Sequence, residues 1–269
     1  MINTGLTVYY QTFRDIHEKI WDRVDRVIIA SLHFMPLQGG DVCLHLNDKS
    51  PDDSIFDEMW DTMEEFAITK PVGILIGGAG GGLSALLDDP WNSMSYSVLQ
   101  ALLASKPFIG TIVIDVEELV DIHKLSSFLT KIRKDYPDYG IAMTPICSAV
   151  TGTTPGMGGF RYRELVDICS VIDEFMVQIY QADDFTRSTC ETIRKMYPEQ
   201  MITPGFLSSE FIPKDLQARL MSEQFTNVIL WELGEHGTEA LVRAFSPLYR
   251  HMDWERGHSC LRIIDKFSI

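Results

Sequence analysis

Eight short apolar runs recur along the 269-residue chain, and each is followed by a stretch with helical periodicity. The runs lie at residues 6–12, 27–34, 72–76, 110–116, 140–145, 175–180, 201–206 and 228–233. The helix-like stretches lie at residues 13–24, 54–68, 95–105, 126–136, 159–171, 186–197 and 214–224 and in a tail that begins at Thr238. Strands that alternate with helices predict a parallel sheet. Eight such units predict a closed (β/α)₈ TIM barrel, formed by residues 1–269 as one domain.

The charge balance excludes several classes of partner. The formal net charge is -15, and an acidic surface repels both the phosphates of nucleic acids and anionic membranes. No apolar run is long enough to span a bilayer. No basic segment followed by an apolar one opens the chain, so we expect a cytoplasmic monomer, or a secreted protein if a leader has been removed. A neutral ligand such as a carbohydrate remains compatible with this charge.

The cysteines and histidines show no metal-binding pattern. The five cysteines are sparse and odd in number, and none has the CxxC spacing of a zinc or redox site. The seven histidines show no ligand spacing either, and the segment from Asp41 to His45 stands alone. No GxSxG nucleophile motif is present. We therefore expect no metal and no cofactor.

The run at 110–116 ends in two acidic residues. Side chains alternate along a strand, so Val113, Asp115 and Glu117 share one face, opposite the apolar residues Ile112 and Ile114. The polar face should point into the barrel, and active sites of such barrels lie at the carboxyl ends of the strands. The alternative is that Asp115 and Glu117 cap the next helix or solvate a loop.

These residues resemble the DxxDxDxE motif that family-18 glycoside hydrolases carry on their fourth strand. The last two acidic positions of the motif match Asp115 and Glu117. The first two do not, because Gly110 and Val113 occupy them. The resemblance implies that Glu117 is the proton donor.

Two further strands resemble the same family. The third run ends in six residues, 77–82, of which five are glycine. Its alternatives are a dinucleotide or phosphate loop, whose GxGxxG spacing is imperfect here, a tight turn, or the SxGG-type strand end of chitinases, which places Gly78 at the ligand. In the sixth run, Met176, Gln178 and Tyr180 share a face and resemble the Q-F-Y-N strand of plant class III chitinases. There, the tyrosine contacts the acetamido group of the substrate; the alternative is a buried tyrosine bonded to backbone.

The first and last strands carry aromatic residues. Trp231 resembles the tryptophan that floors the sugar-binding subsite of the family, and its alternative is a core side chain. Tyr9 resembles the family's aromatic first strand. The resemblance therefore covers the whole barrel in order, with modest motifs on each strand.

The resemblance implies a hydrolase for β-linked N-acetylglucosamine, either chitin oligomers or an N-glycan core. The substrate's own acetamido oxygen would attack the anomeric carbon, so configuration is retained without an enzyme nucleophile. Asp115 would orient the acetamido N–H, Tyr180 and Gln178 would hold the acetamido group, and Trp231 would floor the subsite. The rival interpretations are a non-catalytic carbohydrate-binding or storage barrel and a barrel adapted to another acid-catalysed reaction.

Val113 is the main departure from the family. The family has an aspartate there that shares a proton with the next aspartate on the strand, and two carboxyl groups in contact raise one pKa. Without that partner we expect Asp115 to be ionised over a wider pH range and turned toward Glu117. Repulsion between the two would then keep Glu117 protonated.

Overall fold

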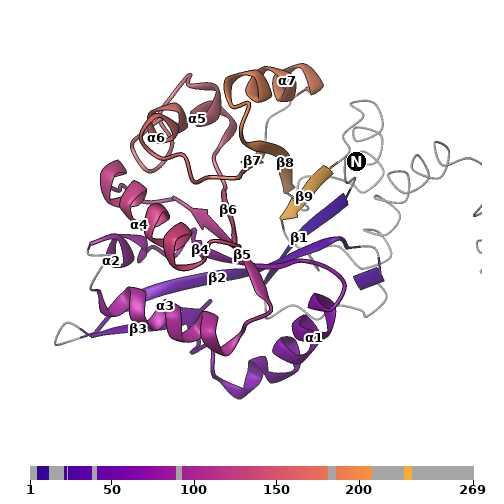
Figure 1. The fold of residues 1–269 in the computed structure, drawn as a ribbon, viewed down its shortest axis with the longest axis vertical. Coiled ribbons are helices and arrows are strands. Elements are labelled where there is room, and N and C mark those ends of the chain that lie inside the picture. Colours follow the sequence, from indigo (N-terminus) through magenta and orange to yellow (C-terminus); the bar gives the residue numbers. More distant parts are fainter. Residues whose placement is uncertain are drawn as a thin grey trace, which may run out of the picture.

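The computed structural model describes residues 5–11, 21–22, 24–37, 41–88, 93–180, 186–207 and 227–231. Its eight parallel strands are β1 (Gly5–Gln11), β2 (Arg26–Pro36), β4 (Val72–Gly77), β5 (Ile109–Asp115), β6 (Gly140–Met143), β7 (Glu174–Gln178), β8 (Met201–Leu207) and β9 (Asn227–Trp231). They form a ring in the order β1-β9-β8-β7-β6-β5-β4-β2, and pairing of β1 with β2 closes it. The predicted (β/α)₈ barrel is confirmed (Figure 1).

The described helices lie in the connections between β2 and β8 and cover that part of the outside of the barrel (Figure 1). The described helices that match predicted stretches are α1 (Asp57–Ala67), which follows a 3-10 turn at Ser54–Phe56, α3 (Met94–Ser105), α4 (Ile122–Asp135), α6 (Tyr162–Ile168) and α7 (Arg187–Met196). Helix α4 begins earlier than predicted because Asp121 caps it, accepting hydrogen bonds from the backbone N–H groups of His123 and Lys124. The predicted stretch at 214–224, the tail from Thr238 and most of the stretch at 13–24 lie outside the described residues.

Three elements were not predicted. Strand β3 (Val42–Leu46) folds back antiparallel on β2, with His33 opposite His45, so β2 extends beyond its predicted end at residue 34. Leu44 and Leu46 are buried and alternate with Cys43 and His45, which is an ordinary strand signal that was overlooked in the sequence. The short helices α2 (Leu83–Leu87) and α5 (Cys147–Thr151) each span five residues, too few for a helical period to be read from the sequence.

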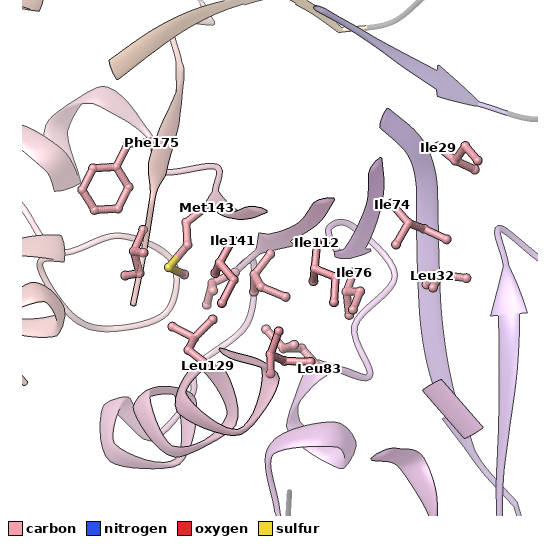
Figure 2. Close-up of a cluster of buried hydrophobic side chains, with 14 of the residues drawn as sticks. Ile29, Leu32, Ile74, Ile76, Leu83, Ile112, Leu129, Ile141, Met143 and Phe175 are labelled. Carbon is pink, nitrogen blue, oxygen red and sulfur yellow. The ribbon is translucent and has the colours of Figure 1, made fainter. Parts of the chain in front are cut away.

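The strands have two apolar faces, as expected for a barrel buried on both sides. The outer face packs against the helices, where Ile112 and Ile141 of the barrel lie near Leu129 of α4 (Figure 2). The inner face forms a second cluster inside the barrel. Its members are Tyr9, Ile28, Ala30, Leu75, Val113, Ala142, Met176 and Ile229.

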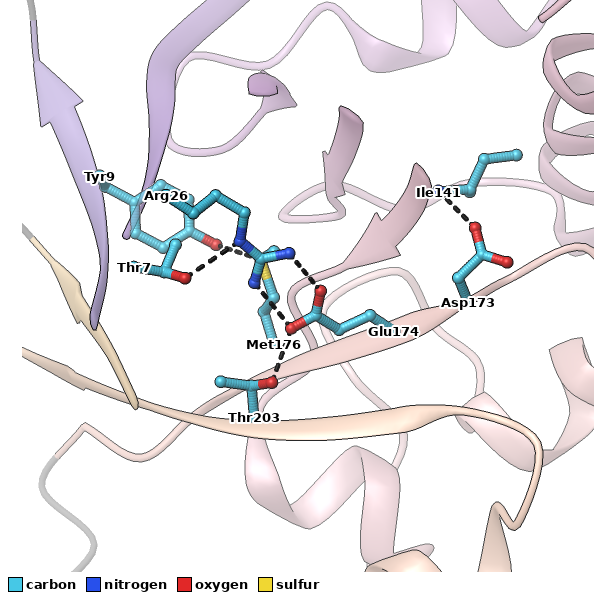
Figure 3. A network of polar contacts seen from close by, with 8 residues as sticks. All are labelled: Thr7, Tyr9, Arg26, Ile141, Asp173, Glu174, Met176 and Thr203. Carbon is cyan, nitrogen blue, oxygen red and sulfur yellow. Dashed lines mark hydrogen bonds and ion pairs between the residues drawn. The ribbon is translucent and has the colours of Figure 1, made fainter. Parts of the chain in front are cut away.

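A buried ion pair lies below this inner cluster, at the amino-terminal ends of the strands (Figure 3). Arg26 donates from its two terminal nitrogens to the two carboxylate oxygens of Glu174, at 2.7 and 2.9 Å. Its Nε donates to Thr7 Oγ1 at 3.0 Å, and Thr203 Oγ1 donates to Glu174 Oε1 at 2.6 Å. Because β2 and β7 lie opposite each other in the ring, the pair joins two sides of the barrel across its lumen.

Candidate active site

The carboxyl end of β5 places two acids at the mouth of the barrel. Val113 lies in the inner cluster, Asp115 is buried just above it with 6% of its surface exposed, and Glu117 follows at the pocket. The side-chain alternation predicted for this strand is confirmed. Gln178 Nε2 donates to Asp115 Oδ1 at 3.2 Å and to the Thr144 carbonyl at 3.0 Å. Asp115 is also hydrogen-bonded to the side chains of Thr144 and Glu117.

A pocket of about 270 Å³ opens above Asp115. Six of the eight predicted site residues line it: Gly78, Asp115, Glu117, Gln178, Tyr180 and Trp231. They come from β4, β5, β7 and β9 or the residues just after them, so closure of the barrel brings them together. This volume is slightly below the range of roughly 300–1,000 Å³ typical of small-molecule sites. Their chemical roles stay predictions.

Tyr9 and Met176 were predicted to bind substrate, but they do not line the pocket. Both belong to the inner cluster below the pocket, and Tyr9 Oη donates to Met176 Sδ at 3.3 Å. The Tyr9 ring packs under Trp231, with ring centroids 4.8 Å apart. These two residues therefore support the floor of the pocket and do not line it. Their strand parity was right, but each lies too deep along its strand to line the pocket.

The glycine-rich segment after β4 wraps closely around β5. Gly77 and Gly78 have φ of +97° and +85°, a region that favours glycine, and a Cβ at Gly77 would collide with the Asp115 carbonyl. Gly78 N–H donates to the same carbonyl at 3.0 Å. The segment is thus a tight turn that brings backbone against the acid pair.

Sequence reasoning missed five residues that line the pocket: Gln11, Ser31, His33, Asn47 and Ala79. Asn47 follows the unpredicted strand β3, and its side chain is bonded to the backbone of Ala30 and Ser31. Burial, and the nearby His45, lower the pKa of His33. Gln11, Ser31 and His33 are polar residues that alternate with apolar ones on β1 and β2, and this alternation was the signal that could have found them.

The two acids share a hydrogen bond, and their pKa values are displaced. Burial is the largest cause that raises the pKa of Asp115 to about 7, and the nearby Glu117 carboxyl adds to it; bonds from Thr144 and Gln178 act in the opposite direction. Burial also raises the pKa of Glu117, while its bond with Asp115 lowers it. The expectation that Asp115 is ionised over a wider pH range is wrong, because desolvation outweighs the loss of an acidic neighbour at Val113. Asp115 does turn toward Glu117, as expected.

Replacing Asp115 by Asn should remove a pH-dependent loss of stability. The native chain holds a proton on Asp115 that the unfolded chain releases near the ordinary pKa of 3.8, so stability falls as pH rises from about 4 to about 7. The difference in unfolding free energy between Asp115→Asn and the wild type should therefore be larger at pH 8 than at pH 5, by on the order of 2 kcal/mol in favour of the variant. Urea denaturation at both pH values measures this gain. Asp61→Asn, on an exposed position of α1, is the matched control, and an equal gain in both variants would contradict the assignment.

The described part of the chain shows neither a metal site nor a helix that could cross a membrane. No three His, Cys, Asp or Glu side chains there converge in an arrangement that could hold a metal ion. No helix among those residues has the length and apolar character needed to cross a membrane.

Comparison with known proteins identifies the fold. No protein-family profile matches the chain, and no curated protein matches it. A fungal endo-beta-N-acetylglucosaminidase of glycosyl hydrolase family 18 is 22% identical, with a TM-score of 0.70 over 90% of this chain and 97% of the other. A chitinase from Aspergillus fumigatus is 19% identical, with a TM-score of 0.71 over 92% and 99%. A family-18 chitinase from Pseudoalteromonas aurantia is 16% identical, with a TM-score of 0.72 over 91% and 99%.

These likenesses define the class of fold as the (β/α)₈ barrel of glycoside hydrolases. Within that class, the fold of this chain is similar to the barrel of family-18 chitinases, as the resemblance of the sequence predicted.

Proposed function

We propose that the chain is a glycosidase that cleaves β-linked N-acetylglucosamine with retention of configuration. The observation that carries the proposal is the hydrogen-bonded pair of Asp115 and Glu117 in one pocket with Tyr180 and Trp231. A general acid that works near neutral pH needs a raised pKa, and burial raises the pKa of both carboxyl groups. The fold, which this chain shares with chitinases and an endo-beta-N-acetylglucosaminidase, supports the same substrate class.

In this proposal Glu117 protonates the glycosidic oxygen, and the acetamido oxygen of the substrate attacks the anomeric carbon. Asp115 accepts the acetamido N–H and stabilises the positive intermediate. When Asp115 turns to the substrate, its proton passes to Glu117 along the hydrogen bond that the two acids share. This transfer leaves the acid protonated at the moment of bond cleavage.

Gln178 takes a different part from the one first expected. Its amide nitrogen already donates to Asp115 and to the Thr144 carbonyl, so Gln178 positions Asp115 and does not donate to the acetamido group. Tyr180 then supplies the hydroxyl for the acetamido carbonyl, and Trp231, supported from below by Tyr9, stacks under the sugar ring.

A second candidate is a carbohydrate-binding barrel without catalytic activity. Val113 favours it, because an apolar residue stands where the family has an acid directly below Asp115. Both functions bind sugar, so ligand binding and turnover must be measured separately.

The test combines thermal shift with turnover on soluble chito-oligosaccharides and on an N-glycan. A rise in melting temperature together with product formation supports the hydrolase. A rise in melting temperature with no product at every pH tested from 4 to 8 supports the binding protein. If neither occurs with any of these glycans, the barrel serves another reaction and the proposal fails.

A further inference from the structure

Two large apolar side chains stand exposed on the mouth of the barrel next to Glu117. Leu119, two residues beyond the acid, is 80% exposed, and Met157, in the turn at 156–160, is 52% exposed. The turn that carries Met157 adjoins Leu119, since a Cβ at Gly159 would lie 3.0 Å from Leu119 Cδ2. We call Leu119 and Met157 the apolar rim.

The rim is held in place by hydrogen bonds on both sides of Leu119. On one side, Glu118 accepts from Ser84 N–H at 3.0 Å and from its hydroxyl at 3.4 Å. On the other side, Val120 N–H donates to the Gly158 carbonyl at 3.3 Å, which joins this loop to the turn that carries Met157. The side chain of Leu119 is therefore displayed by an anchored loop and not by a loose one.

The rim lies to one side of the pocket. One end of the pocket is lined by residues of β1 and β2 and by Asn47 after β3. Among the described residues that line the pocket, none follows β6, which lies opposite β1 in the ring. Glu117 thus lies on the side of the pocket from which the chain after β5 leads to Leu119, and the rim is formed by the loops after β5 and after β6.

We propose that the apolar rim binds an apolar leaving group, so that a substrate with an apolar aglycone is bound more tightly than one with a small aglycone that does not reach the rim. The inference rests on the proposed function: the glycone occupies the pocket, and the leaving group departs from the oxygen that Glu117 protonates, on the rim side. Sugars are bound by hydrogen bonds and by aromatic rings. Leu119 and Met157 offer aliphatic and thioether surface, and among the described residues no large exposed hydrophobic is aromatic.

The test compares two ligands that share a glycone and differ only in the aglycone: 4-nitrophenyl and methyl N,N′-diacetylchitobioside. Dissociation constants are measured by calorimetry with a Glu117→Gln chain, which slows turnover, over a time in which no nitrophenolate is released, and with the same chain carrying Leu119→Asn and Met157→Gln. Loss of the apolar contacts should weaken binding of the nitrophenyl ligand by roughly three- to tenfold and leave the methyl ligand unchanged. Ile68→Asn is the matched control, because Ile68 is also 80% exposed but lies just before β4, on the opposite face of the barrel.

Each outcome decides the question. Equal binding of the nitrophenyl ligand with and without the rim substitutions overturns the rim while leaving the hydrolase intact. An equal loss for both ligands also overturns it, because the substitutions would then act on the pocket itself. Failure of both ligands to bind the Glu117→Gln chain refutes the proposed function, and the rim with it.

Discussion

Replacement of Glu117 by Gln should lower kcat on an unactivated chito-oligosaccharide by about 10²–10⁴-fold, the usual contribution of general acid catalysis. Gln keeps the size of the side chain and can still bond to Asp115, but it has no proton to give to the glycosidic oxygen. The dissociation constant for the same ligand should change little, because Trp231 and Tyr180 still line the pocket. Steady-state hydrolysis and calorimetry measure the two quantities separately.

Glu118→Gln is the matched control. Glu118 is the next residue along the chain, but its carboxylate accepts hydrogen bonds from Ser84 outside the pocket, and a Gln oxygen can accept the same bond. Its kcat should stay within a small factor of the wild type. A Glu117→Gln chain that hydrolyses unactivated substrate at the wild-type rate would remove Glu117 from the role of acid.

The leaving group sharpens this experiment. A nitrophenolate departs without prior protonation, so the loss of the acid should be much smaller on an activated aryl glycoside than on the oligosaccharide. A uniform loss on both substrates would instead indicate that the substitution has disturbed the position of Asp115. The contrast separates proton donation from the positioning of the acid pair.

The predictable part of the site follows from strand alternation. Each barrel strand sends every second side chain into the lumen, so the parity of Val113, Asp115 and Glu117 could be assigned from the sequence and is found in the structure. Ring closure then brings Trp231 of the last strand beside them. The same rule cannot give depth along a strand, and for that reason Tyr9 was placed in the pocket instead of beneath it.

Two features depended on contacts between distant segments and escaped prediction. The turn that carries Asn47 reaches the pocket only because β3 folds back on β2, and no local pattern shows where that hairpin ends. The direction of the pKa shift of Asp115 was predicted wrongly for a related reason. The pKa of Asp115 is raised chiefly because the neighbouring strands exclude water from it, and the identity of Val113 alone does not reveal this burial.

The second large effect concerns stability and lies at the other end of the barrel. Glu174→Gln should lower the free energy of unfolding by about 3–5 kcal/mol, because it leaves the Arg26 charge buried without a counter-charge. The pair is well shielded: Glu174 is 4% exposed, and its two oxygens accept three hydrogen bonds, two from Arg26 and one from Thr203. Urea denaturation with a fixed slope measures the loss. Per folded molecule, ligand binding should stay unchanged, since the inner cluster separates the pair from the pocket.

Two comparison variants identify the cause of that loss. Glu191→Gln breaks an exposed ion pair in which Arg187 Nε lies 3.0 Å from Glu191 Oε1. It should lower the free energy of unfolding by less than about 1 kcal/mol, because water screens both charges. The double variant Arg26→Met with Glu174→Leu removes both buried charges and should regain most of the stability that Glu174→Gln loses, because no unpaired charge remains. If the double variant is as unstable as Glu174→Gln, the network holds the barrel through shape and hydrogen bonds with Thr7 and Thr203, and charge pairing is not its basis. If Glu174→Gln costs no more than Glu191→Gln, the cross-lumen pair contributes nothing beyond an ordinary surface contact.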